Sequence, residues 1–277
     1  MFILELIKTI LLGIVEGITE WLPISSTGHL ILLNNFISLD VSEEFWEMFQ
    51  VVIQLGAILA VVLLFWGKLW PFGKNKSVTK KRKTWNLWFK IIVGVLPSAI
   101  IGLLLDDWFT ANFYNYVSVA IALVVYGVLF IVIERWRADK KPRIRKVEQI
   151  TYKDALLVGA FQVLSIIPGT SRSGSTILGG MILGLSRGAA AEFSFFLAIP
   201  TMVGASLLKG VKFMLSGVAV TGQEIVILLV GCLVSFVVSV ATIRFLMDFV
   251  KRHTFSAFGV YRIVLGILVL GYFLITL

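Results

Sequence analysis

About six stretches of this sequence are apolar over roughly 20 residues each, which is the length needed to cross a lipid bilayer. They lie at 48–67, 86–105, 114–133, 189–208, 224–243 and 257–277. Of all residues, 58% are hydrophobic and only 15% are charged, whereas a soluble domain carries about a quarter charged residues. The sequence therefore predicts an all-α polytopic membrane protein, folded as a single integral membrane domain over residues 1–277.

The formal net charge of +9 does not indicate nucleic-acid binding. The basic residues form short clusters between apolar stretches, as they do in cytoplasmic loops that face anionic lipid. Cys232 is the single cysteine, which excludes an internal disulfide framework and a cysteine metal site.

Four further apolar pieces do not read as ordinary spans. Residues 2–22 include Glu16 and Glu20, and the pieces 28–39, 155–167 and 175–185 would extend only about 17–20 Å as helices. The hydrocarbon core is about 30 Å thick. A polar break joins residues 2–22 to 28–39, and another joins 155–167 to 175–185. Such a break is tolerated at membrane depth only inside protein or beside a wet cavity. We therefore expect two re-entrant helical hairpins, one in each half of the chain.

The two breaks also suggest an internal repeat. The letters PISST at 23–27 align with PGTSR at 168–172, and each half reads as one hairpin followed by three spans. Because three is odd, the second half would point the opposite way, in the inverted-repeat plan of many transporters. The pseudo-repeats are expected at roughly 1–135 and 150–277.

Loop charges predict the orientation through the positive-inside rule. The segment 36–46 is acidic, with Asp40, Glu43 and Glu44, and Asp106 and Asp107 lie in another loop on that side. The segments 68–83 and 135–153 are rich in basic residues, and Lys251 and Arg252 close the fifth span. Among the basic residues of the first are Lys68, Lys74, Lys76, Lys80, Lys81, Arg82 and Lys83. The first hairpin should open outward, the second inward, and both termini should lie outside.

The first break opens with EGITE at 16–20, which places Glu16 and Glu20 on one helical face. Carboxylates this close in an apolar region repel each other, so the pair could bind Mg²⁺ or Ca²⁺, or divide into a base and an acid. The alternative is that both carboxylates face water at the mouth of the hairpin.

Hydroxyl groups follow in PISSTGH at 23–29, which supplies Ser25, Ser26, Thr27 and His29. Gly28 and His29 are expected to open a short helix, whose free backbone N–H groups suit a phosphate. A serine beside a histidine and carboxylates has the parts of an activated nucleophile. The alternative is ordinary helix capping with a packed histidine.

The second break, PGTSRSGST at 168–176, supplies the positive charge that the first one lacks. Arg172 presents a planar fork matched to phosphate oxygens, and nearby glycines allow backbone amides to form an anion site. A structural pairing of Arg172 with Glu16 or Glu20 is the alternative. Glu192 could reach the site or pair with Arg187, and Gln162 is expected to hydrogen-bond between helices.

These motifs, together with VIQLGAILAV at 52–61 and EFSF at 192–195, resemble the undecaprenyl-diphosphate phosphatase family (BacA/UppP) over essentially the whole chain. The resemblance implies a bacterial cytoplasmic-membrane enzyme that removes the terminal phosphate of undecaprenyl diphosphate, recycles the lipid carrier of peptidoglycan synthesis and confers resistance to bacitracin, which binds the same substrate. It implies an active site on the outer, periplasmic side and a requirement for a divalent cation. Carried over by motif, the catalytic residues are Glu16, Glu20, Ser26, His29 and Arg172, and the phosphate-binding residues are Ser25, Thr27, Gly169, Thr170, Ser171 and Ser173.

Several alternatives stay open at this level. Ser26 could attack phosphorus after activation by a carboxylate or by His29, or Glu20 could orient a water that attacks directly. Acid-phosphatase-like lipid phosphatases need a second histidine, and none follows Arg172 before His253. An inverted-repeat transporter or lipid flippase is the non-enzymatic alternative. The oligomeric state is not fixed, and a homodimer is one of the assemblies left open.

Overall fold

The computed structural model describes residues 2–34, 36–73 and 76–276. Within these ranges the secondary structure is helical, and strand-like pairing is limited to one isolated bridge between Ile144 and Leu185. Six helices are long and apolar enough to cross a membrane, and each overlaps a predicted span. They are α3 (Glu43–Leu64), α5 (Val78–Phe113), α6 (Tyr116–Arg137), α9 (Arg187–Leu215), α10 (Gly222–Arg252) and α11 (Ser256–Thr276). The prediction of an all-α polytopic membrane protein is confirmed.

Local capping explains where several of these long helices begin. A polar side chain accepts a hydrogen bond from the backbone N–H three residues ahead and satisfies one of the unpaired groups of the first turn. The capping residues are Ser42 for α3, Asn115 for α6, Ser186 for α9 and Thr221 for α10.

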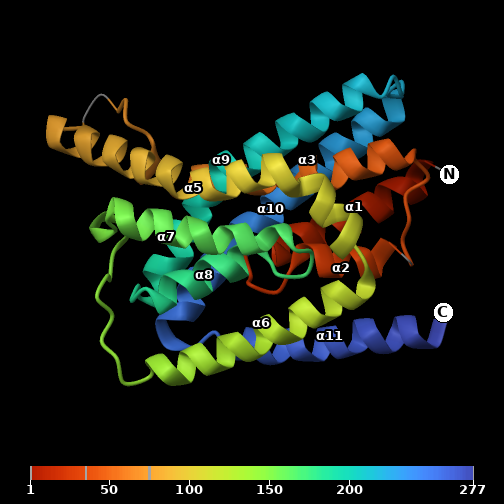
Figure 1. Cartoon of the computed structure of the whole chain (residues 1–277). Coiled ribbons are helices and arrows are strands. Elements are labelled where there is room, and N and C mark those ends of the chain that lie inside the picture. Colours follow the sequence, from red (N-terminus) through yellow and green to blue (C-terminus); the bar gives the residue numbers. More distant parts are fainter. Residues whose placement is uncertain (1, 35, 74–75, 277) are drawn as a thin grey trace.

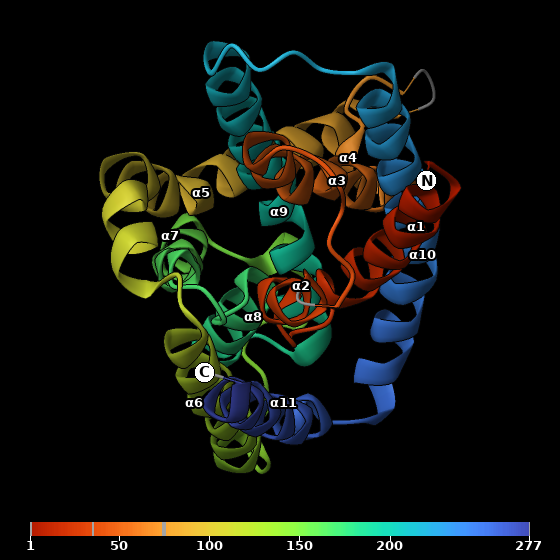
Figure 2. The same cartoon turned by 90° about the vertical axis from the view of Figure 1, so that its right-hand side faces the viewer.

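Four shorter helices form two hairpins. They are α1 (Phe2–Thr19) with α2 (Ser26–Asn34), and α7 (Tyr152–Val163) with α8 (Arg172–Ile182). The long helices surround α2 and α8 (Figure 2), and the loops of the two hairpins are hydrogen-bonded to each other through Ser173. That these hairpins enter and leave the bilayer on one face stays a prediction. Three short elements were not expected: α4 (Trp66–Leu69), η1 (Val147–Gln149) and η2 (Leu164–Ile166).

The two short inner helices begin earlier than the sequence predicted. The helix α2 starts at Ser26 rather than Gly28, and α8 starts at Arg172 rather than Ser175. In both cases the preceding serine turns the chain and caps the helix, so that the polar residues after it become the first helical turn.

Reciprocal packing joins the two halves of the chain. The helix α1 of the first half packs on α10 of the second, and α7 of the second half packs on α5 of the first. The α5–α7 crossing is close because a Cβ on Gly159 would overlap the backbone of Gly94, and small residues allow such approach between membrane helices. The assignment of 1–135 and 150–277 as repeats stays a prediction.

The basic segments lie at one end of the molecule. The connections before α5, between α6 and α7 and between α10 and α11 are opposite to both chain termini (Figure 1). At this end Arg187 pairs with Glu134 at 2.6 Å, and Arg143 pairs with Asp154 at 2.5 Å. Of the loop charges used to predict orientation, Lys74 and the side chains of Asp106 and Asp107 lie outside the described part of the chain.

Candidate active site

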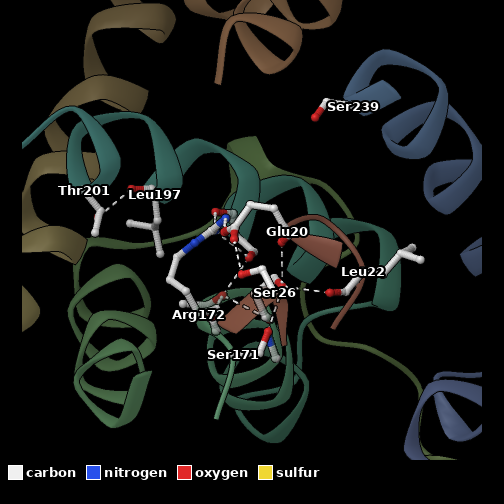
Figure 3. A network of polar contacts seen from close by, with 12 residues as sticks. Glu20, Leu22, Ser26, Ser171, Arg172, Leu197, Thr201 and Ser239 are labelled. Atoms are coloured by element: carbon white, nitrogen blue, oxygen red, sulfur yellow. Dashed lines mark hydrogen bonds and ion pairs between the residues drawn. The ribbon is translucent and has the colours of Figure 1, made fainter. Parts of the chain in front are cut away.

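The two inner loops bring a hydroxyl, a carboxylate and a guanidinium together. The Oγ of Ser26 donates to Oε2 of Glu20 at 2.8 Å, and Nη2 of Arg172 donates to Oε1 of the same carboxylate at 3.1 Å. Figure 3 shows these side chains converging from the end of α1, the start of α2 and the start of α8. The side chains of Arg172 and Glu20 are only 9% and 6% exposed. The predicted convergence of the two breaks is therefore a feature of the structure.

The two loops share one backbone device. Ser25 and Ser171 are the non-glycine residues with positive φ in the described chain, at 74° and 73°. Each Oγ accepts from the N–H three residues ahead, in Gly28 and Gly174. Such conformations cost about 1–3 kcal/mol and persist where the surrounding structure enforces them, often at active sites. Each strained serine delivers its following residue to the first position of a helix.

This geometry corrects the alignment of the two breaks. The sequence placed Ser26 opposite Ser171, but the shared backbone conformation places Ser25 opposite Ser171. Ser26 therefore corresponds to Arg172, one residue further along. The nucleophile candidate of one half and the cation of the other occupy equivalent positions, each at the positive end of a helix dipole.

Arg172 is held by groups from another helix. Its Nη1 donates to the backbone oxygen of Ser194 at 2.7 Å and contacts the Ser194 Oγ at 3.3 Å, and the guanidinium lies 5.7 Å from the ring centre of Trp21. Thr176 donates to the Oγ of Ser194 at 2.7 Å. The Nε of Arg172 has no hydrogen-bond partner among the described residues. Sequence reasoning noted Ser194 only as a letter of EFSF and missed this supporting role.

Glu16 lies fully buried on α1, and neither of its carboxylate oxygens has a hydrogen-bond partner within the described residues. A buried carboxyl without a donor is costly unless it takes up a proton or a cation. No group of three or more His, Cys, Asp or Glu side chains able to hold a metal occurs in the described chain. Mg²⁺ usually binds through one or two carboxylates plus waters and substrate phosphates, so Glu16 with Glu20 fits that ligand set.

His29 is not placed to act as a base for Ser26. Its Nδ1 is 2.7 Å from the backbone oxygen of Ser25, and its Nε2 is 2.6 Å from the hydroxyl of Tyr261, on which the ring also stacks. Since a carbonyl oxygen only accepts, Nδ1 carries the proton and Nε2 accepts from Tyr261. Both ring nitrogens are engaged, whereas the hydroxyl of Ser26 contacts Glu20.

The remaining predicted residues divide by exposure. Thr27 and Ser171 are half-buried, as Ser26 and His29 are, so a ligand can reach these positions. Buried positions are Ser25, Gly169, Thr170 and Ser173. The hydroxyl of Ser173 donates to the backbone oxygens of Glu20 and Leu22 at 3.0 and 3.3 Å, which ties the loops together.

Sequence reasoning missed Arg262, which lies on α11 and is fully buried. Its guanidinium donates to the backbone oxygens of Pro23 at 3.1 Å, Gly169 at 2.9 Å and Thr170 at 3.1 Å, so one side chain binds both loops. Weaker contacts reach Ala122 and Leu123 on α6. A charged residue inside the predicted span 257–277 was the available signal, because such residues usually mark functional positions.

Two secondary predictions have different outcomes. Glu192 does not pair with Arg187, because Arg187 binds Glu134 and the carboxylate of Glu192 accepts from Lys68 at 2.5 Å. The unexpected helix α4 brings Lys68 to this position. Gln162 donates to Ser98 on α5 and Thr201 on α9, so its predicted role between helices is confirmed.

The assembled groups suit nucleophilic transfer of an anionic group. A hydroxyl hydrogen-bonded to a carboxylate can lose its proton as it attacks, while a guanidinium and two helix N-termini stabilise negative charge. Phosphoryl transfer depends mainly on such positioning and charge stabilisation.

Comparison with known proteins points to the same chemistry. A family model described as "Bacitracin resistance protein BacA" matches residues 9–268. The undecaprenyl-diphosphatase of Desulfitobacterium hafniense is 58% identical over 99% of this chain and 98% of its own length. That of Acetivibrio thermocellus is 58% identical over 98% of both chains, and that of Enterococcus faecalis is 54% identical over 99% of both.

Replacing Arg262 with lysine should lower the melting temperature in detergent by roughly 5 °C or more, because lysine keeps the charge but cannot reach both loops, and each lost hydrogen bond to a charged group is worth roughly 1.5–3 kcal/mol. Differential scanning fluorimetry measures the change. Arg244→Lys, at an exposed position on α10, is the matched control and should melt as the wild type. Equal melting of both variants would show that Arg262 does not hold the loops.

Proposed function

The chain belongs to the BacA family, and from that premise we propose how its two loops act on a diphosphate lipid. The enzyme hydrolyses undecaprenyl diphosphate to undecaprenyl phosphate and inorganic phosphate. This reaction recycles the lipid carrier for peptidoglycan synthesis and confers bacitracin resistance. The observation that carries our proposal for the site is the contact of one carboxylate, that of Glu20, with both Ser26 and Arg172.

Substrate binding is assigned to the guanidinium, the two helix starts and the half-buried hydroxyls. Arg172 and the backbone N–H groups at the starts of α2 and α8 neutralise the terminal phosphate, and the half-buried hydroxyls of Thr27 and Ser171 donate to its oxygens. Ser194 and Glu20 fix the guanidinium before the substrate arrives. Preorganised donors stabilise a developing charge without reorganising during the reaction.

In the chemical step, the hydroxyl of Ser26 attacks the terminal phosphorus and its proton passes to Glu20, which lies 2.8 Å away. A bond forms between Oγ and phosphorus, and the bond from phosphorus to the bridging oxygen breaks, releasing undecaprenyl phosphate. Water then attacks the phosphorus of the phosphoserine, the bond from phosphorus to Oγ breaks, and Glu20 returns its proton to Oγ. The oxygen and protons of the water leave with the inorganic phosphate. The geometry favours Glu20 over His29 as base, because His29 is engaged with Ser25 and Tyr261.

Glu16 and Glu20 are the groups that would hold a divalent cation, Mg²⁺ or Ca²⁺. The support is the pair of unpartnered oxygens on Glu16, which lies on the same helical face as Glu20. When bound, the cation supplies charge neutralisation for the diphosphate. Because Glu16 is fully buried, its contact with the cation would lie where bulk water does not reach.

We place the protein in the bacterial cytoplasmic membrane with the active site open to the outside. The chain is a multi-pass membrane protein, and its basic connections lie opposite to both termini (Figure 1). By the positive-inside rule the basic end faces the cytoplasm, and the mouth between α1 and α2 faces outward.

Two finer proposals concern partners. Bacitracin competes for the diphosphate substrate, so added substrate should restore phosphate release in its presence.

The chain forms a homodimer, the commonest closed assembly, and light scattering of the detergent-solubilised protein measures its mass directly.

Replacing Ser26 with alanine should reduce phosphate release from undecaprenyl diphosphate by at least about a thousandfold, since the attacking atom is removed. Malachite-green detection of phosphate measures the rate. Ser38→Ala, at an exposed loop position, should turn over as the wild type does. If Ser26→Ala keeps a tenth or more of the activity, water attacks directly and Ser26 is not the nucleophile.

Mg²⁺ or Ca²⁺ should raise the melting temperature of the substrate-free protein, because a ligand at 100 times its dissociation constant stabilises the folded state by roughly 2.7 kcal/mol. The double variant Glu16→Gln/Glu20→Gln should lose this shift. Glu43→Gln/Glu44→Gln removes two exposed carboxylates and should keep it. A shift that survives in the first variant would place the cation elsewhere.

Single cysteines in a Cys232→Ser background test the orientation. A membrane-impermeant maleimide should label Ser38→Cys in intact cells, because the loop between α2 and α3 faces outward. Asp139→Cys, between α6 and α7, should react only after the membrane is permeabilised. The reverse labelling pattern would invert the proposed orientation.

A further inference from the structure

A basic cavity of about 580 Å³ lies away from the active site, between α4, the first turns of α5 and η1. The start of α5 and the connection before it, which line the cavity, are at the end of the molecule that holds the basic connections (Figure 1). Among the described residues, the lining of the cavity contains five lysines and a single carboxylate, from Glu148. The lysines are Lys68, Lys76, Lys80, Lys83 and Lys90.

One face of α5 carries three of these lysines. Lys80, Lys83 and Lys90 are spaced so that they share a face with Leu87, which also lines the cavity. Lys90 is the deepest, with 8% of its surface exposed. Its ammonium makes one long hydrogen bond in the described part of the chain, 3.4 Å to the backbone oxygen of Glu148. An ammonium has three donors, so this buried cation is under-satisfied.

The other lysines differ in how far they are neutralised. Lys68 lies 2.5 Å from Glu192 and 3.5 Å from Glu148. Burial works against its charge, but these carboxylates outweigh burial and raise the pKa of Lys68 above its ordinary value. Lys80 and Lys83 form no ion pair with an acidic residue in the described chain. The cavity therefore keeps an excess of positive charge around Lys80, Lys83 and Lys90.

Exposed aromatic side chains place this cavity at the depth of lipid headgroups. Trp66 and Trp70 stack with ring centres 4.6 Å apart, and Phe72 packs edge-on against Trp85 at 5.8 Å. All four side chains are at least 40% exposed. Tryptophans gather where a membrane protein crosses the headgroup region. Trp85 belongs to α5 itself, so the helix that carries the lysines also meets the bilayer interface.

We propose that this cavity binds the phosphate headgroup of an anionic phospholipid from the adjoining leaflet. The ammonium groups of Lys80, Lys83 and Lys90 bind the phosphate oxygens, and the acyl chains lie along the exposed apolar face of α5. A membrane lipid is always present beside the cavity and can supply the missing negative charge. A soluble anion is present only at low concentration. The proposal does not depend on which residues hydrolyse the substrate.

The test uses the full-length protein and counts bound lipids by native mass spectrometry. Phosphatidylglycerol and phosphatidylcholine are titrated separately. The variant Lys80→Glu/Lys83→Glu reverses two cavity charges. Lys81→Glu/Arg82→Glu makes the same change of charge in the same turn of α5, at positions that do not line the cavity. Unchanged melting temperature and phosphate release establish that both variants are folded.

Each direct hydrogen bond from an ammonium to a phosphate oxygen is worth roughly tenfold or more in affinity, so the cavity variant should bind phosphatidylglycerol at least tenfold more weakly than wild type. The control should stay within about threefold, and phosphatidylcholine binding should be equal in all three proteins. Equal loss of binding in both variants would show that diffuse surface charge, and not the cavity, attracts the lipid. It would overturn the proposal. Displacement of the bound lipid by inorganic phosphate at equal concentration would show a soluble-anion site instead, and would also overturn the proposal.

Discussion

The ion pair between Glu20 and Arg172 joins the two halves of the chain at the centre of the bundle. Both side chains are less than a tenth exposed, and removing one partner of such a pair leaves an uncompensated charge that costs roughly 3–5 kcal/mol. The same carboxylate accepts from Ser26. The interaction that holds the loops together therefore also organises the groups that act on the substrate, so stability and catalysis depend on one contact.

The loops are built alike but carry opposite chemistry. Strained serines at 25 and 171 start the two inner helices in the same way, and the following residue is a hydroxyl in one half and a guanidinium in the other. Arg262 then binds carbonyl oxygens of both loops from a third direction. Arg262 has no carboxylate partner among the described residues and is satisfied by backbone dipoles, and this arrangement fixes the spacing between the two helix starts.

The membrane helices could be predicted from the sequence because the bilayer imposes a minimum apolar length. The meeting of the two breaks could be inferred because one supplied carboxylates and the other a positive charge. The register of the repeat could not be predicted. It depends on the positive φ of Ser25 and Ser171, and neither position is a glycine, the residue that usually indicates such a conformation. The predicted pairing of Glu192 with Arg187 was wrong because its partner, Lys68, lies on α4. This helix is only four residues long and gives no periodic signal in the sequence. Arg262 was visible as a charge within a span, but the carbonyls that it binds come from distant loops.

The distance along the chain between Glu20 and Arg172 has a consequence for how the protein is made. The pair is separated by 152 residues, so at about 5–20 residues per second the first hairpin leaves the ribosome roughly 8–30 s before its arginine. During that interval the second half supplies no cation for the carboxylates of α1. The ion pair that joins the two loops therefore forms only after α8 has been synthesised, and the active site is completed late in biogenesis.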